Sequence, residues 1–121
     1  MALVLVATAG SATLRAQAKS EPVTVVSHVD IKPDAYLPKA VETAESLLDA
    51  ERMATKKDVG LVSYGVYEEV GSSNHFTIVE TWRDRTAYDR HVGSDHTVAF
   101  RNKVQPLLGG PFDTRVHTTL R

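Results

Sequence analysis

A glutamate set among large apolar residues is the first candidate for chemistry in this sequence. In the segment HFTIVETW at 75–82, Phe76, Ile78, Glu80 and Trp82 share one face, because side chains alternate along a β-strand. A carboxylate buried among such neighbours needs a hydrogen-bond partner or a proton. We therefore expect Glu80 to have a specific partner, and two interpretations stay open: a structural ion pair with an Arg or His of a covering helix, or a catalytic group.

Histidine is the second candidate, since its side chain titrates near neutral pH and suits a general base for a phenolic proton. The chain has five histidines, and His28, His91 and His96 are expected near the covered side of the sheet. Gly93 and Ser94 separate His91 from His96, which places them on different helical pieces. Their spacing matches no standard zinc pattern, so no metal site is expected. For each histidine, a helix-terminating or core role remains the alternative.

Aromatic residues provide candidate walls for a ligand. Trp82 is the only tryptophan, and it serves either core packing at a strand end or the lining of a pocket for a flat aromatic molecule. Tyr64, Tyr67 and Tyr88 are either hydroxyl donors or sheet packing.

The composition excludes several function classes. The chain has 121 residues, which suits one domain, and a net charge of -1, which does not suit a phosphate-neutralising nucleic-acid binder. The absence of cysteine excludes disulfides, thiolate nucleophiles and zinc sites built on sulfur. The sequence contains neither a phosphate-binding glycine loop nor a G-x-S-x-G motif.

The first twenty residues resemble a targeting segment or an N-terminal arm. Residues 2–9 are apolar, and Ala16-Gln17-Ala18 has the A-x-A form of a signal-peptidase site, although no basic residue precedes the apolar run. Removal of residues 1–18 would imply an exported or periplasmic protein, and a retained segment would imply a cytoplasmic one. The apolar run is too short to cross a membrane. The domain itself is expected to occupy residues 21–121.

Turn signals divide the remaining chain into alternating strands and helices. Strands are expected at 23–31, 61–69, 75–82 and 112–120, the middle two joined as a hairpin by the turn residues 71–74. A helix is expected from an N-cap at Asp34 to about Ala54. Asp84 should cap a short helix to about His91, and Ser94 a second helical piece to Leu107.

The order β-α-β-β-α-β predicts an α+β fold of the ferredoxin-like, split βαβ type, in which helices cover one face of a four-stranded antiparallel sheet. The second face still carries apolar side chains, including Val26 and Val79. An uncovered apolar face favours a partner, and the simplest partner is another copy of the chain. A homodimer is therefore expected.

Several motifs together resemble the antibiotic biosynthesis monooxygenase family. The specific part is E-x-W-x-D at 80–84, followed by A-x-x-x-H-x-x-S-x-H-x-x-x-F at 87–100. The similarity covers about residues 22–121 and is greatest to the quinol monooxygenase-like members. It implies a dimeric α+β barrel, a pocket between sheet and helices in each subunit, and oxygenation of an electron-rich aromatic molecule by O₂ without flavin, haem or metal. The haem-degrading branch fits less well, because Ser27 and His28 stand where that branch has an asparagine.

Cofactor-free oxygenation requires a base, orientation of the substrate and exclusion of water. The predicted base is His91 or His96, with Glu80 as its orienting or proton-sharing partner. The residues expected to contact a small aromatic substrate are Trp82, Phe76, Phe100, His28 and Tyr64. The competing hypothesis is a dimeric α+β barrel that binds or isomerises a small molecule without oxygen chemistry. No nucleic-acid or membrane partner is expected.

Overall fold

A computed structural model describes residues 20–121, so the predicted signal segment at 1–18 lies outside the described part. In this part, four strands form one sheet: β1 (Val23–Asp30), β2 (Leu61–Glu69), β3 (Ser72–Trp82) and β4 (Asp113–His117). The helices are α2 (Ala40–Thr55), α3 (Arg85–Val92) and α4 (Asp95–Val104), followed by the 3₁₀ turn η1 (Gln105–Leu107). The order is the predicted β-α-β-β-α-β.

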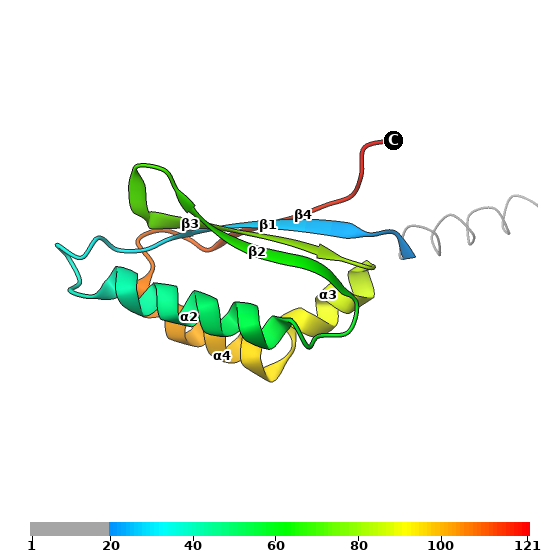
Figure 1. Cartoon of the computed structure of the whole chain (residues 1–121), viewed down its shortest axis with the longest axis horizontal. Helices are drawn as coiled ribbons and strands as arrows, with labels where there is room; N and C mark the ends of the chain where they lie inside the picture. The colour runs from blue at the N-terminus through cyan, green and yellow to red at the C-terminus, as the bar shows by residue number, and fades with distance from the viewer. Residues whose placement is uncertain (1–19) are drawn as a thin grey trace, which may run out of the picture.

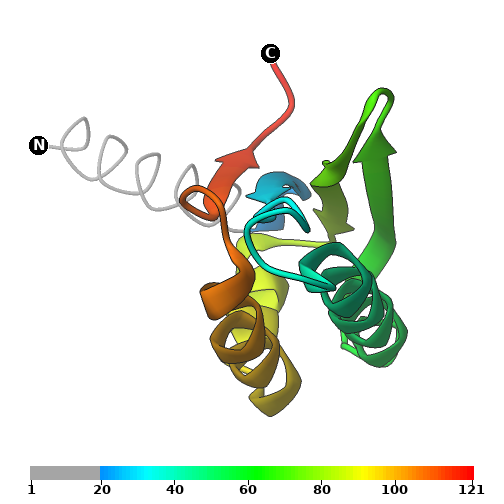
Figure 2. The ribbon, with the colours of Figure 1, turned by 90° about the vertical axis from the view of Figure 1, so that its left-hand side faces the viewer.

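The molecule has two layers, with the sheet above and the helices below (Figure 1). The strand order is β2-β3-β1-β4, and each neighbouring pair is antiparallel. The view along the layers shows α2, α3 and α4 on the same side of the sheet (Figure 2). The α+β, ferredoxin-like prediction is therefore confirmed.

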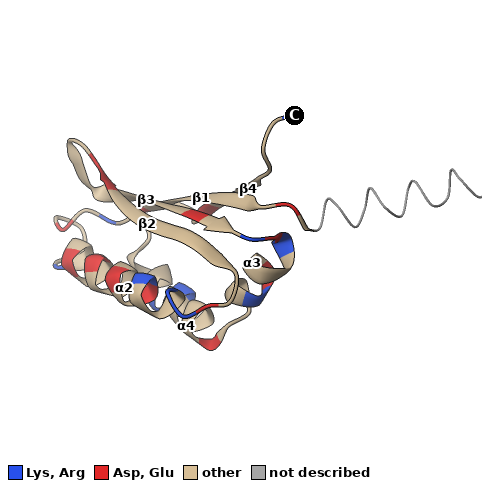
Figure 3. Ribbon diagram, turned by 45° about the vertical axis from the view of Figure 1, so that its right-hand side comes forward, with Lys and Arg blue, Asp and Glu red and all other residues tan. Residues whose placement is uncertain are grey.

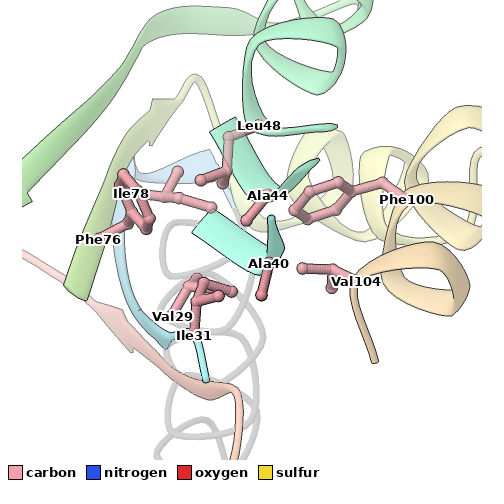
Figure 4. Packing of buried hydrophobic residues seen from close by; sticks show 9 residues of the cluster. All are labelled: Val29, Ile31, Ala40, Ala44, Leu48, Phe76, Ile78, Phe100 and Val104. Carbon is pink, nitrogen blue, oxygen red and sulfur yellow. The ribbon is translucent and has the colours of Figure 1, made fainter. Parts of the chain in front are cut away.

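The sheet face toward the helices carries two apolar clusters that are separated by polar residues. The larger cluster joins β1, β3, α2 and α4 around residues such as Val29, Phe76 and Phe100 (Figure 4). The smaller cluster contains Val23, Val25, Trp82, Ala87 and Tyr88. Because strand side chains alternate, Ser27 on β1 and Glu80 on β3 interrupt the apolar rows where the two clusters meet.

The first helix begins later than the sequence indicated. Contrary to the prediction, Asp34 is not the N-cap of this helix. The N-cap position is occupied by Lys39, which has a φ of 64°, and the helix starts at Ala40. Pro38 explains the delay, because proline disfavours α-helical conformation at the residue before it. Asp34 nevertheless helps the helix start, since its Oδ1 accepts a hydrogen bond of 3.0 Å from the backbone N–H of Val41.

The two later helices follow the predicted caps closely. The Asp84 side chain accepts from the Ala87 N–H at 2.8 Å, and the Ser94 hydroxyl accepts from the Thr97 N–H at 3.4 Å. The regular α-helix ends at Val104, and the predicted extension to Leu107 is a 3₁₀ turn that contains Pro106. The last strand spans Asp113–His117 and is shorter than predicted.

The turn into β2 depends on a glycine. Gly60 has a φ of 87°, and a Cβ added there would lie 2.5 Å from the Cβ of Ala87 on α3. Only glycine combines this backbone conformation with so close an approach of the helix. The turn therefore fixes α3, which carries His91, against the start of β2. Among the described residues, no helix is long and apolar enough to cross a membrane.

Candidate functional site

A cavity of about 470 Å³ opens between the sheet and the helices, at the place where Ser27 and Glu80 separate the two apolar clusters. Its sheet wall includes Tyr64, Ile78 and Thr114 in addition to these two residues. The helices contribute Glu51, Tyr88, His91, Thr97 and Phe100, and Phe112 completes the apolar part of the lining. The volume lies in the range usual for pockets that bind small organic molecules.

Glu80 has the specific partners that its buried position requires. Its side chain is 7% exposed, and its Oε1 accepts a hydrogen bond of 3.0 Å from the indole Nε1–H of Trp82. The same oxygen lies 3.4 Å from Nε2 of His91. Glu80 and His91 therefore form a close acid-imidazole pair that faces the cavity.

His91 is held by a second carboxylate on its other ring nitrogen. Its Nδ1 lies 2.8 Å from Oδ2 of Asp58, and a carboxylate at this distance accepts the Nδ1–H. The ring lies against Trp82, with 4.7 Å between the ring centroids. Ser94 adds a further restraint, because its hydroxyl donates to the His91 carbonyl at 2.7 Å. With Nδ1 engaged, Nε2 is the nitrogen that faces Glu80.

His96 lies behind this pair and bridges two carboxylates. Its Nδ1 is 3.0 Å from both oxygens of Glu51, and its Nε2 is 2.9 Å from Oδ2 of Asp58. Glu51 also accepts from the hydroxyl of Thr97 at 2.7 Å. Since carboxylates accept and do not donate when ionised, donation from both ring nitrogens describes His96 as an imidazolium. The turn between α3 and α4 brings its ring centroid to 5.6 Å from that of His91.

Burial and neighbouring charges shift the pKa values of several groups in and beside the cavity. Burial raises the pKa of Glu80, although His91 and the hydrogen bond from Trp82 act in the opposite direction. Burial, followed by the nearby charges of Glu80 and Glu51, strongly raises the pKa of Tyr64, so its hydroxyl stays protonated. Burial alone would lower the pKa of His96, but its hydrogen bonds to Glu51 and Asp58 raise it overall.

The mouth of the cavity carries a cation. Arg101 lines the cavity from the exposed side of α4, and the carbon of its guanidinium group lies 3.6 Å from the ring centroid of Phe112. Stacking of this kind holds a guanidinium over an aromatic face. Val92 and Val98, which are 46% and 47% exposed, complete an apolar rim. Figure 3 shows that acidic residues lie along α2, with basic residues near its C-terminal end.

The structure brings together only some of the residues that the sequence suggested. Glu80, His91, Tyr64 and Phe100 line one cavity. His96 does not line this cavity; it contacts the lining residues Glu51 and Thr97 and is joined to His91 through Asp58.

The remaining candidates lie outside the lining of that cavity. Trp82 is 0% exposed and sits behind Glu80 and His91. Phe76 belongs to the larger apolar cluster. His28 is exposed and pairs with Thr77 across β1 and β3, on the sheet face away from the helices.

The sequence reasoning missed Glu51, Asp58 and Thr97. Glu51 had a usable signal, because Ala44, Leu48 and Glu51 recur at helical spacing and the buried stripe of α2 thus continues onto a carboxylate. Asp58 lies in a polar break between α2 and β2, where nothing in the local pattern distinguishes it from a solvated turn residue.

Within residues 20–121, Glu51, His91 and His96 each offer one potential ligand atom, and these atoms lie within 4.8 Å of one another. The same side chains already have hydrogen-bond partners in Thr97 and Asp58. No buried side-chain nitrogen or oxygen of the described residues lacks a partner. A hydrogen-bonded cluster therefore accounts for the arrangement of these three residues.

The chain is similar to known proteins both in sequence and in fold. Residues 22–103 match the model of a family described as antibiotic biosynthesis monooxygenase. Rv0793 of Mycobacterium tuberculosis, provisionally named a monooxygenase, is 33% identical over 92 residues, which cover 76% of this chain and 85% of the relative. The solved structure of Rv0793 has a TM-score of 0.74 over 84% of this chain and 97% of its own, with 32% identity.

Two further relatives extend the comparison. An uncharacterised protein of Synechocystis is 26% identical over 97 residues, which are 80% of this chain but 63% of that protein, so the chain spans less than two thirds of its length. SnoaB of Streptomyces nogalater, described as a cofactor-independent oxygenase, has a TM-score of 0.71 over 84% of this chain and 95% of its own, with 16% identity. Similarity at that identity supports a shared fold.

Proposed function

Because this chain belongs to the antibiotic biosynthesis monooxygenase family, we propose that it is a cofactor-independent monooxygenase that oxidises a hydroquinone-like or polyphenolic aromatic molecule with O₂. The observation that carries the proposal is the Glu80-His91 pair, with 3.4 Å between its facing atoms, in the wall of a cavity that also offers the rings of Phe100 and Phe112. An acid-base pair beside an apolar slot suits deprotonation of a phenol.

The overall reaction balances without an external reductant. A hydroquinone and O₂ give a hydroxyquinone and water: one oxygen atom enters the ring and the other leaves as water. The four electrons that reduce O₂ come from the substrate. The protein is thus required to bind, orient and deprotonate the substrate rather than to supply electrons.

The Glu80-His91 pair accepts the phenolic proton in this mechanism. Asp58 accepts a hydrogen bond from the Nδ1–H of His91, so Nε2 and Glu80 are left to share and receive protons on the cavity side. The resulting phenolate is electron-rich enough to pass one electron to O₂, and the radical pair then combines to a peroxide. Return of the proton gives a hydroperoxide on the ring. Cleavage of its O–O bond, with loss of the hydrogen on the same ring carbon, releases water and leaves the new carbonyl oxygen in the product.

Tyr64 and the apolar wall orient the reactants. The raised pKa of Tyr64, caused by burial and by the charges of Glu80 and Glu51, keeps its hydroxyl available as a donor to a substrate or peroxide oxygen. Phe100 and Ile78 provide contact for a flat ring and exclude water. Trp82 acts indirectly, through its hydrogen bond to Glu80.

We also propose that two copies of the chain associate through the sheet face that the helices leave uncovered (Figure 2). Val26 and Val79 pair directly across β1 and β3 on this face, and Tyr67, which is 58% exposed, lies on the same face over Gly65. Light scattering is expected to give about twice the chain mass of 13.2 kDa. A monomer that persists at high micromolar concentration would contradict this proposal.

Oxygen uptake with a panel of hydroquinones tests the proposed activity. One O₂ should be consumed per substrate, and ¹⁸O₂ should place one labelled atom in the product and one in water. Glu80→Gln and His91→Gln should each reduce turnover by about 10²- to 10⁴-fold, as is usual for loss of a general base. His75→Gln is the matched control, since His75 bonds Glu69 at 3.0 Å in the β2-β3 hairpin, outside the cavity lining.

Binding without turnover would favour the alternative function. Trp82 is the only tryptophan and contacts His91, so a ligand in the cavity should change its fluorescence. Quenching by hydroquinones without any oxygen uptake would indicate a small-molecule binder or an isomerase. Formation of hydrogen peroxide without label in the product would indicate an oxidase and would also contradict the proposal.

A further inference from the structure

The strongest feature outside the cavity wall is the position of His96 between Glu51 and Asp58. Glu51 is 3% exposed and belongs to α2, whereas Asp58 is 20% exposed and lies in the connection to β2. His96, 26% exposed, reaches both carboxylates from the first turn of α4. It therefore joins three segments of the chain at the edge of the site.

Both carboxylates also face His91, the residue that the proposed mechanism uses. Asp58 Oδ2 contacts His91 Nδ1 at 2.8 Å and His96 Nε2 at 2.9 Å, so the same oxygen serves both rings. Glu51 Oε1 lies 3.0 Å from His96 Nδ1 and 4.0 Å from His91 Nε2. A change in the charge of His96 should therefore act on His91 through Asp58, which contacts both rings at hydrogen-bond distance, and more weakly through Glu51.

Among the groups around His91, His96 is the one that can offset the negative charge of the carboxylates. The titratable groups that face the His91 ring from the elements packed against it are Glu51 on α2, Asp58 before β2, Tyr64 on β2, Glu80 on β3, Tyr88 on α3 and His96 on α4. Three of these groups are carboxylates, and only His96 can be positive. Three partly or fully buried carboxylates without a cation would draw a proton onto His91.

We propose that His96 is a positioning residue that acts through Asp58 and Glu51: its positive charge offsets part of the negative charge of these carboxylates, lowers the proton affinity of the His91 imidazole and so leaves that ring able to accept a proton. Asp58 is then free to fix the His91 tautomer by accepting the Nδ1–H. The consequence for turnover rests on the proposed function, whereas the effect on the protonation of His91 does not.

The expected size of the effect follows from the geometry. A unit charge at 5.6 Å from the His91 ring, with an effective dielectric constant of about 20 to 40, corresponds to a change in proton affinity of roughly one to two pH units. Loss of the His96 charge should raise the titration midpoint of His91 by this amount. In a plot of turnover against pH, the acidic limb should move to higher pH by a similar amount.

Proton NMR titration of the histidine rings in the resting protein measures this effect without substrate. In His96→Gln, which retains hydrogen bonding but not the charge, the His91 midpoint should rise by about one pH unit or more. In His96→Lys, which restores a positive charge, the midpoint should return toward the parent value. His75→Gln, which removes a histidine remote from the cluster, should leave the midpoint unchanged.

The outcomes separate this proposal from the proposed oxygenase function. A shifted His91 midpoint in a protein that consumes no oxygen would support the charge coupling and contradict only the oxygenase proposal. An unchanged or lowered midpoint in folded His96→Gln would overturn the coupling, whatever the activity. Stoichiometric Zn²⁺ binding that disappears in His96→Gln would also overturn it, because the ring nitrogens would then serve a metal rather than the carboxylates.

Discussion

Trp82→Phe tests whether the tryptophan acts on Glu80 rather than on the ligand directly. The substitution retains an aromatic ring in the smaller apolar cluster but removes the indole N–H, which donates to Glu80 Oε1 at 3.0 Å. Glu80 is thereby left with His91 as the only remaining partner among those described above. Both stability and the protonation of Glu80 should respond.

The expected loss of stability has two parts. A hydrogen bond to a charged acceptor contributes about 1.5 to 3 kcal/mol. Because Trp82 is 0% exposed, the missing part of the indole leaves a void; about 40 Å³ at about 24 cal/mol per Å³ adds about 1 kcal/mol. The free energy of unfolding should therefore fall by about 2.5 to 4 kcal/mol, which is a drop in Tm of roughly 15 °C for a domain of this size.

Urea unfolding followed by far-UV circular dichroism measures this loss, since the variant lacks its only tryptophan. Tyr88→Phe is the matched control: Tyr88 packs against Trp82 with 6.4 Å between ring centroids, but its hydroxyl makes no hydrogen bond to Glu80. The control should lose less than about 1 kcal/mol. The difference between the two variants, after subtraction of about 1 kcal/mol for the void, gives the contribution of the indole N–H.

The pH dependence gives a second, independent readout of Trp82→Phe. The hydrogen bond from Trp82 lowers the pKa of Glu80 against the larger effect of burial, so its removal should raise that pKa further. The acidic limb of turnover should then move to higher pH. Two results would refute the claim that Trp82 acts through its hydrogen bond to Glu80. One is a loss of less than about 1 kcal/mol in the free energy of unfolding. The other is weaker ligand binding with no change in the pH profile of turnover.

Three further predictions concern His96, Arg101 and Gly60. The pKa of His96 is raised by Glu51 and Asp58 despite burial, so the stability from these ion pairs is complete below the ordinary pKa of 6.5 and is lost as pH rises through the folded-state pKa. In urea titrations between about pH 6 and 9, the free energy of unfolding of His96→Gln should therefore fall less steeply with pH than that of the parent. Arg101→Met should weaken binding of a carboxylated hydroquinone about tenfold more than that of its neutral analogue, measured by Trp82 quenching. Gly60→Ala should cost at least about 1 to 2 kcal/mol in urea, because the backbone conformation and the contact with Ala87 both oppose a Cβ.

Each of these three predictions has a clear contrary result. A His96→Gln variant whose stability declines as steeply as that of the parent would contradict the raised pKa. Equal weakening of both ligands in Arg101→Met would assign that residue to packing on Phe112 rather than to charge recognition. If Gly60→Ala unfolds at the same urea concentration as the parent, α3 can shift away from the turn without cost.

The fold could be predicted because local patterns determine its elements. Alternation of side chains defined the β2-β3 hairpin, and Asp84 and Ser94 act as caps through short-range hydrogen bonds that depend on neighbouring residues alone. The prediction failed at Asp34 because the helix start depends on Pro38 and on the positive φ of Lys39, which override a good capping residue. Boundaries are decided by such local competition, whereas the element order is not.

The candidate site could be predicted only in part, because a site depends on contacts between distant segments. Glu80 was identifiable, since an acid in an apolar strand face needs a partner wherever the strand lies. His91 and His96 were identifiable by residue type, but not their separate positions: one lines the cavity and the other lies between two carboxylates. Asp58 reaches His91 across 33 residues of sequence, and no periodicity encodes that contact.

The polar cluster of Glu80, His91 and His96 lies near the junction of the two apolar clusters. Ser27 and Glu80 interrupt the buried rows of β1 and β3, and a polar row inside a core is tolerated only where every group has a partner. Ser27 is paired with Thr114 on β4 at 2.9 Å, and Glu80 is paired with Trp82 and with His91, which lies near the end of α3 just before the turn at Gly93 and Ser94. If the cluster existed only to stabilise the fold, an apolar replacement would serve as well or better. The position of the cluster beside a cavity of about 470 Å³ therefore supports the proton-accepting role that we propose for it.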